Sequence, residues 1–172
     1  MKNEKTIKEV TTIFGLLMII SLIVFMRRSE WSDRLTKQGS ITVAHYYRID
    51  KGKTNYFCYI YKVGDDYFTC STSNGDDFVE NLNKEPIQSF PVVYDAIDNK
   101  LHIVIWNNKF TNDFQLGKKI EKLPNEIQLI EENTNFWSGV SPTADKNDKK
   151  EIEEYFKIKN NLNKGKSDLA TN

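Results

Sequence analysis

The sequence lacks nearly every short motif that identifies an enzyme or a cofactor-binding protein. It has no Walker A loop, no G-x-G-x-x-G or G-x-S-x-G pattern, no H-E-x-x-H pair and no C-x-x-C pair. Its two histidines, His45 and His102, lie in stretches typical of strands, and their separation matches no regular zinc-ligand spacing. We therefore predict no catalytic residue, no cofactor and no metal site, and we interpret both histidines as structural or surface residues.

The sequence also lacks an excess of charge of one sign. Lysine plus arginine and aspartate plus glutamate both total 24, so the net charge is zero. Without a basic field, nucleic acid is not an expected partner. The acidic doublets at 65–66 and 76–77 each follow a glycine. Aspartate is favoured there in turns and at helix starts, and the spacing of an EF-hand calcium loop is absent.

One long apolar run lies near the N-terminus, at residues 10–26, and carries no charged side chain. As a helix it spans roughly 25 Å, close to the hydrocarbon thickness of about 30 Å, and it is apolar on all sides. A cleaved signal peptide fits less well, because the residues at 25–28 (FMRR) offer no small-residue cleavage site. We predict an uncleaved single-pass transmembrane helix in a bacterial inner membrane, with a flank at 1–9.

Flanking charge does not decide on which side of the membrane the rest of the chain lies, because cations are nearly balanced across the apolar run. These cations are Lys2, Lys5 and Lys8 before it and Arg27, Arg28, Arg34 and Lys37 after it. The arginine pair favours a cytoplasmic domain, whereas the short lysine-bearing N-terminus favours export. Together with the cysteine pair described below, this leads us to predict an extracytoplasmic domain.

The segment 39–140 is predicted to fold as one small domain of mainly β structure, in the α+β class, after a juxtamembrane linker at 27–38. The predicted strands are 40–49, 54–63, 66–73, 90–94 and 101–106. The predicted helical pieces are 73–82, a turn within 108–116 and, as either helix or strand, 126–130. Because the strand 54–63 is apolar on both faces, we expect the antiparallel sheet to form a small barrel.

Tyrosines of the central hairpin form a candidate ligand-binding face. Tyr59, Tyr61 and Tyr67 lie on neighbouring predicted strands. Exposed aromatic side chains on a curved sheet bind ligands in OB-folds. Packing in the domain core accounts for most of the aromatic residues equally well.

The cysteines, Cys58 and Cys70, flank the predicted turn of this hairpin and form a candidate disulfide. With a three-residue loop at 63–65 they face each other, and a cross-strand disulfide is geometrically allowed. With a two-residue loop at 64–65 they lie on opposite faces, which forbids a bridge. Two buried free thiols are the third alternative.

Beyond residue 141 the chain becomes polar, and we predict a C-terminal helix and tail at 141–172. Helical periodicity extends over 145–162. Its apolar stripe is only about two turns long, which favours a solvated helix followed by a disordered tail from residue 163 over a helix that docks on a partner.

Three segments carry a resemblance to a group of known sequences: 39–43 (GSITV), 90–95 (FPVVYD) and 101–105 (LHIVI). With the preceding apolar helix, they resemble uncharacterised bacterial membrane-anchored proteins over residues 10–117. The resemblance implies a single-pass protein with a small barrel-like domain, and it carries no activity across.

Two classes of function are compatible with this sequence. We favour a membrane-tethered, non-enzymatic domain of the bacterial cell envelope that binds the lipid bilayer through its helix and a protein partner or ligand through its domain. The alternatives are a small membrane-anchored enzyme that uses Cys58 or Cys70 with His45 or His102, and a membrane-bound immunity protein. The enzyme would require a histidine beside a cysteine.

Overall fold

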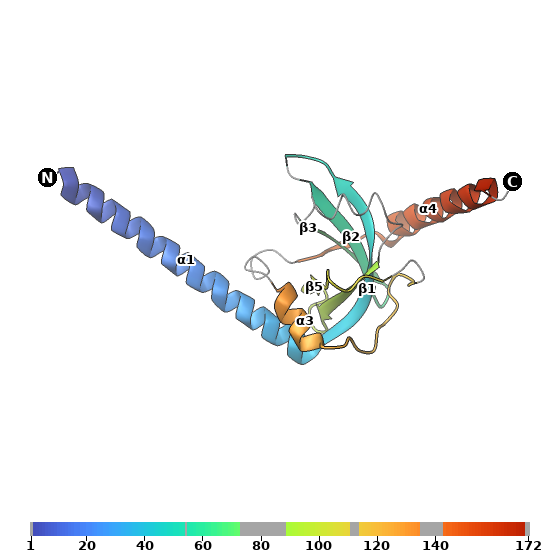
Figure 1. Cartoon of the computed structure of the whole chain (residues 1–172), viewed down its shortest axis with the longest axis horizontal. Helices are drawn as coiled ribbons and strands as arrows, with labels where there is room; N and C mark the ends of the chain where they lie inside the picture. The colour runs from blue at the N-terminus through green and yellow to red at the C-terminus, as the bar shows by residue number, and fades with distance from the viewer. Residues whose placement is uncertain (1, 54, 73–88, 111–113, 135–142, 171–172) are drawn as a thin grey trace.

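The computed structural model describes residues 2–53, 55–72, 89–110, 114–134 and 143–170. A long helix leads into a sheet domain, from which a second helix projects on the other side (Figure 1). The elements are α1 (Lys2–Gln38), β1 (Gly39–Asp50), β2 (Tyr56–Val63), β3 (Asp66–Thr72), β4 (Ser89–Asp95), β5 (His102–Val104), α3 (Glu126–Asn133), β6 (Asp145–Asn147) and α4 (Lys149–Ala170).

The first helix, α1, is continuous from Lys2 to Gln38. Its part Ile7–Gln38 is long and apolar enough to cross a membrane. Between residues 7 and 26 every side chain is exposed except Val24. Such a helix is compatible with a membrane anchor or a signal sequence. The predicted linker at 27–38 is helical throughout, so α1 leads directly into the sheet.

The sheet is antiparallel and open, with the strand order β5-β4-β1-β2-β3-β6. The α+β class is confirmed, but the predicted barrel is wrong, because no ladder joins the edge strands β5 and β6 within the described part of the chain. Each edge strand has only 3 residues. A single bridge, between Leu101 and Thr143, links the segments just before them. A bulge between Tyr46 and Arg48 interrupts β1, and bulges of this kind increase the bend of a strand.

The remaining helices and the last strand differ in part from the sequence predictions. The ambiguous segment 126–130 belongs to helix α3. The predicted C-terminal helix begins later, because its first residues form β6, and it continues through the predicted tail to Ala170. The predicted helix at 73–82 lies outside the described residues. So does the centre of the turn predicted within 108–116, and the described residues on either side of it are not helical.

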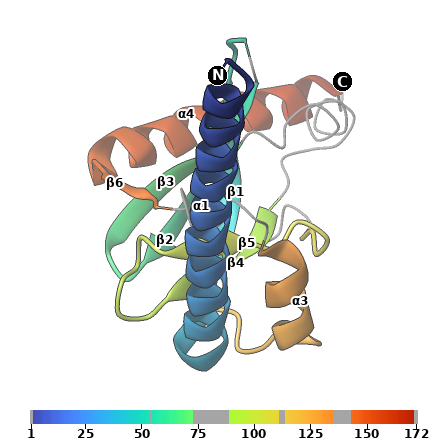
Figure 2. The same cartoon turned by 90° about the vertical axis from the view of Figure 1, so that its left-hand side faces the viewer.

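Alternation along the strands divides the core into three clusters of buried residues. The inner cluster consists of Ala44, Phe57, Tyr59, Tyr61, Phe68, Phe90, Val92, Val104 and Ala144. The α1 cluster consists of Leu35, Ile41, Val93, Ile103, Ile105, Leu123 and Ile130. The α4 cluster consists of Ile60, Tyr67 and Ile152. Figure 2 shows α3 beside the C-terminal part of α1, and α4 crossing the end of the sheet that carries β3 and β6.

Candidate functional site

The junction between α1 and β1 has no linker residue, because Gln38 ends the helix and Gly39 begins the strand. Position 39 requires glycine because there is no room for a side chain. A Cβ at this position would lie 2.2 Å from the backbone oxygen of Leu35 and 2.8 Å from Cγ1 of Val93. Every other residue type carries a Cβ, so only glycine lets the helix turn into the strand this tightly.

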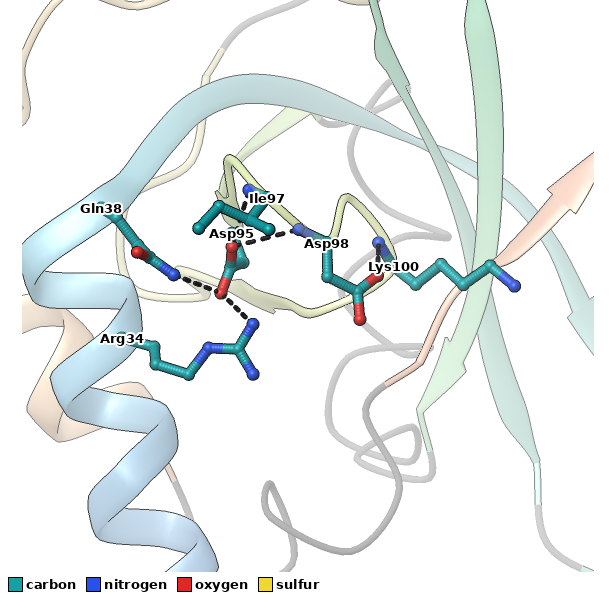
Figure 3. A network of polar contacts seen from close by, with 6 residues as sticks. All are labelled: Arg34, Gln38, Asp95, Ile97, Asp98 and Lys100. Carbon is teal, nitrogen blue, oxygen red and sulfur yellow. Dashed lines mark hydrogen bonds and ion pairs between the residues drawn. The ribbon is translucent and has the colours of Figure 1, made fainter.

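A buried carboxylate fastens this junction to the sheet (Figure 3). Asp95, at the end of β4, is only 1% exposed. Its Oδ2 accepts a hydrogen bond from Nε2 of Gln38 at 3.0 Å and lies 2.6 Å from a guanidinium nitrogen of Arg34. Its Oδ1 accepts the backbone N–H groups of Ile97 and Asp98, at 2.8 and 3.1 Å. Both oxygens therefore have partners.

These contacts keep Asp95 ionised. Burial raises the pKa of the carboxyl. Hydrogen bonds from the backbone of Ile97, from Gln38 and from the backbone of Asp98, together with the charge of Arg34, lower it by more than burial raises it. The net pKa lies below the ordinary value of an aspartate. Because a buried charge is costly without partners, this carboxylate stabilises only the arrangement in which α1 supplies Arg34 and Gln38.

Sequence reasoning did not single out this network. Arg34 and Gln38 lie in the segment interpreted as a linker, and Asp95 was quoted only as the last residue of FPVVYD. A signal was nevertheless present. Arg34 and Gln38 are spaced i, i+4, which places them on one face if the helix continues beyond the apolar run.

The hairpin of β2 and β3 has a two-residue turn, with Gly64 at φ 59° and Val63 paired with Asp66. Of the two predicted registers, this is the one that forbids a bridge. Cys70 pairs with Tyr59 rather than with Cys58. Both cysteines are free thiols. They lie on opposite faces of the sheet, and the candidate disulfide is excluded in this register.

A groove of about 390 Å³ lies at the β3 edge of the sheet, beside the start of α4, and is lined by residues of both faces. It is lined mainly by polar and charged side chains: Tyr47, Arg48, Asp50, Cys58, Thr69, Cys70, Ser71, Thr143, Asp145, Asn147, Glu151 and Ile152. Within it Arg48 pairs with Asp50 at 2.9 Å, and the thiol of Cys58 donates to Oδ2 of Asp50 at 3.3 Å. Burial and the neighbouring carboxylate raise the pKa of Cys58 to about 11. This thiol is protonated at neutral pH and is a poor nucleophile.

Helix α4 closes one side of this groove through its first two turns. Ile152 is buried against Ile60 and Tyr67. The hydroxyl of Tyr155 donates to the backbone oxygen of Tyr47 at 2.5 Å. The predicted solvated helix is therefore docked on the sheet at its N-terminal end.

The inner face of the sheet contains a second polar group, centred on His102. Nδ1 of His102 lies 3.0 Å from the backbone oxygen of Lys100, an acceptor, so Nδ1 carries the proton. Nε2 then accepts from the Tyr59 hydroxyl at 2.6 Å. His102 is only 2% exposed, and burial lowers its pKa to about 4. Cys70 is paired with Tyr59 across the hairpin, so Tyr59 stands between the cysteine and the histidine.

The structure places the other residues singled out from the sequence within the core. The candidate ligand-face residues Tyr59, Tyr61 and Tyr67 are all buried, the first two in the inner cluster and the third under α4. They present no exposed aromatic surface. His45 is also buried, and its Nδ1 is hydrogen-bonded to Ser89 Oγ at 2.9 Å. Within the described residues, no group of His, Cys, Asp and Glu has the arrangement of a metal site.

Searches of protein-family models, curated proteins and solved structures find no match to this chain.

Proposed function

We propose that this chain is a single-pass protein of a bacterial inner membrane whose sheet domain binds a polar segment of a protein partner, without catalysing a reaction. The observation that carries the proposal is the groove beneath α4. Its walls present an arginine, several carboxylates and hydroxyl groups, which are the groups that hydrogen-bond a peptide backbone and polar side chains.

Two properties of the titratable residues support a non-catalytic role. The pKa of Cys58, raised to about 11, disfavours the thiolate that a cysteine enzyme requires. His102 is enclosed in the inner face with both ring nitrogens hydrogen-bonded, and its pKa of about 4 leaves it neutral at physiological pH. Neither group is poised for acid–base work near neutral pH.

The binding proposal is tested by site-specific photo-crosslinking in intact membranes. A photoreactive residue replaces Ser71, in the groove, or Gln128, on the exposed side of α3. We expect a discrete crosslinked product from the Ser71 position that disappears when Glu151, on the opposite wall, is changed to Arg. The same product from the Gln128 position, or persistence with Glu151→Arg, would contradict binding in the groove.

The proposed extracytoplasmic location is tested by adding protease to intact spheroplasts. We expect digestion of the sheet domain while a cytoplasmic marker protein survives. Protection of the domain until the membrane is lysed would place it in the cytoplasm instead.

A further inference from the structure

One side chain within the apolar run of α1, that of Val24, is buried. Val24 is 7% exposed, whereas its neighbours Ile23 and Phe25 are 51% and 62% exposed. Some part of the chain therefore covers α1 within one turn of residue 26, where the apolar run ends. Trp31 follows Val24 by seven residues and Leu35 follows Trp31 by four; both are buried, and these helical spacings place all three on the same side of α1. No long spacer separates the domain from the level at which α1 leaves the apolar run.

The hairpin of β1 and β2 returns toward that level. From the C-terminal end of α1 the sheet runs back toward the side on which the N-terminal half of the helix lies, in both Figure 1 and Figure 2. β1 has 12 residues, an extended length of about 40 Å. The helical segment 27–38, between the apolar run and β1, is only about 18 Å long. Because β1 is more than twice as long as this segment, it reaches the level of the apolar run even though it runs obliquely to α1 (Figure 1).

The tip of this hairpin has the composition of a membrane-interface segment. Lys51, Gly52 and Lys53 are exposed, and Tyr56, at the start of β2, is 45% exposed. The neighbouring Arg48 and Asp50 neutralise each other as an ion pair, so the segment 48–53 carries a net charge of +2 from its lysines. Lysine beside an exposed tyrosine is typical of protein surfaces in the headgroup layer.

We propose that Lys51, Lys53 and Tyr56, at the tip of this hairpin, form a second membrane contact, which binds anionic phospholipid headgroups of the leaflet next to the domain. Lys51 and Lys53 supply the attraction, and Tyr56 lies at the headgroup level. Because the sheet is joined rigidly to α1, the contact fixes the rotation of the whole protein about the axis of α1. The inference rests on α1 being the proposed membrane anchor, and it is independent of what binds in the groove.

Lysine acylation in nanodiscs tests the contact on the full, unmodified chain. The protein is reconstituted in discs of phosphatidylcholine alone or of phosphatidylcholine with phosphatidylglycerol, pulsed with an amine-reactive ester and analysed by mass spectrometry. We expect Lys51 and Lys53 to react about fivefold more slowly in the anionic discs, the factor expected for a lysine at an anionic surface. High salt should remove the difference, since the attraction is screened within about 8 Å at physiological ionic strength.

Lys119 and Lys122 are internal controls. Both are exposed, and they precede Leu123 by four and one residues in the sequence. Leu123 belongs to the buried cluster that contains Leu35, close to the C-terminal end of α1. Their rates should be equal in the two kinds of disc. Equal rates for Lys51 and Lys53, or equal slowing of all four lysines, would overturn the proposal, as would protection that needs added cell extract instead of anionic lipid. Failure of the chain to enter discs would refute the anchor itself, which is a different outcome.

Discussion

The two long helices are attached to the sheet in different ways. α1 is attached through a glycine with no room for a side chain, a buried carboxylate with four donors, and Leu35 within a cluster of seven buried residues. α4 is attached through Ile152 in a cluster of three, one tyrosine hydroxyl and the rim of a polar groove. The ion pair along α4, between Lys149 and Glu153, is exposed.

The difference separates a fixed attachment from an adjustable one. Removing Arg34 or Gln38 would leave the buried charge of Asp95 with only part of its donors, which is costly. Lifting α4 uncovers a cluster of three buried residues, against seven at the α1 junction, and the exposed ion pair along α4 contributes little to stability. We therefore expect the α1 junction to open only with the whole domain, and α4 to open locally.

The largest expected effect is that of Gly39→Ala. The new Cβ would meet backbone as well as Val93, so the helix or the strand must shift. We expect the free energy of unfolding of the domain to fall by at least about 3 kcal/mol, the upper end of the cost of overpacking. Urea unfolding of the protein in detergent micelles, followed by tryptophan fluorescence, measures the change.

Gly15→Ala is the matched control on the same helix, because nothing lies within 4 Å of a Cβ at that position. Alanine is the better helix former, so this variant should unfold no more easily than the parent chain. Equal losses for the two substitutions would show that the junction is not specially constrained.

Acid should lower the stability of the whole sheet domain. His102 is neutral in the fold because its pKa is lowered to about 4, whereas an unfolded histidine titrates near 6.5. The unfolded chain therefore binds more protons between these values, and the free energy of unfolding falls as the pH drops from about 6.5 to about 4, by up to about 3 kcal/mol. Asp95, with a lowered pKa, adds a further loss below about pH 4.

Urea unfolding at a series of pH values measures this slope. His102→Gln removes the titrating group and should flatten the curve between pH 4 and 6.5. A variant with an unchanged slope would assign the acid sensitivity to other residues.

Asp95→Asn tests the ion pair at the junction. The amide keeps the shape but loses the charge that Arg34 and the backbone N–H groups face. Because Arg34 is 34% exposed, solvent reduces the loss, and we expect about 2 kcal/mol rather than the larger cost of a fully buried pair. The comparison variant is Asp66→Asn, whose exposed pair with Lys146 should change stability by no more than about 0.5 kcal/mol.

Ile152→Ala tests the weaker attachment. We expect a loss of about 2 kcal/mol that is confined to the docking of α4, so amides of α4 should exchange hydrogen faster while those of β4 keep their protection. Ile158→Ala, at an exposed position of the same helix, should leave both unchanged. Faster exchange in β4 with Ile152→Ala would mean that α4 is part of the cooperative core.

Local patterns predicted the parts of this fold that depend on neighbours in the chain. The apolar run and the strands β1 to β4 follow from composition and period-2 alternation, and Gly64-Asp65 marked the hairpin. β6 was missed because Asp145, Lys146 and Asn147 have low strand propensity and are held by pairing with β3. The barrel was predicted from the two-sided apolar strands, but the second face is covered by α1, α3 and α4 instead.

The candidate site was harder to predict because its residues come together only in the tertiary structure. The groove residues come from β1, β2, β3, β6 and α4, and no spacing in the sequence places them together. The Asp95 network joins residues 57 positions apart. The buried tyrosines and histidines were visible as residue types, but their exposure depends on tertiary packing.

Because no linker separates α1 from β1 at Gly39, a change in the direction of the helix also changes the direction of the sheet. A transmembrane helix tilts when the bilayer becomes thinner, and a domain on a flexible tether would not follow that motion. Helix, strand and carboxylate are joined directly at this junction; if α1 spans a bilayer as proposed, a change in the tilt of the helix would therefore also change the orientation of the sheet.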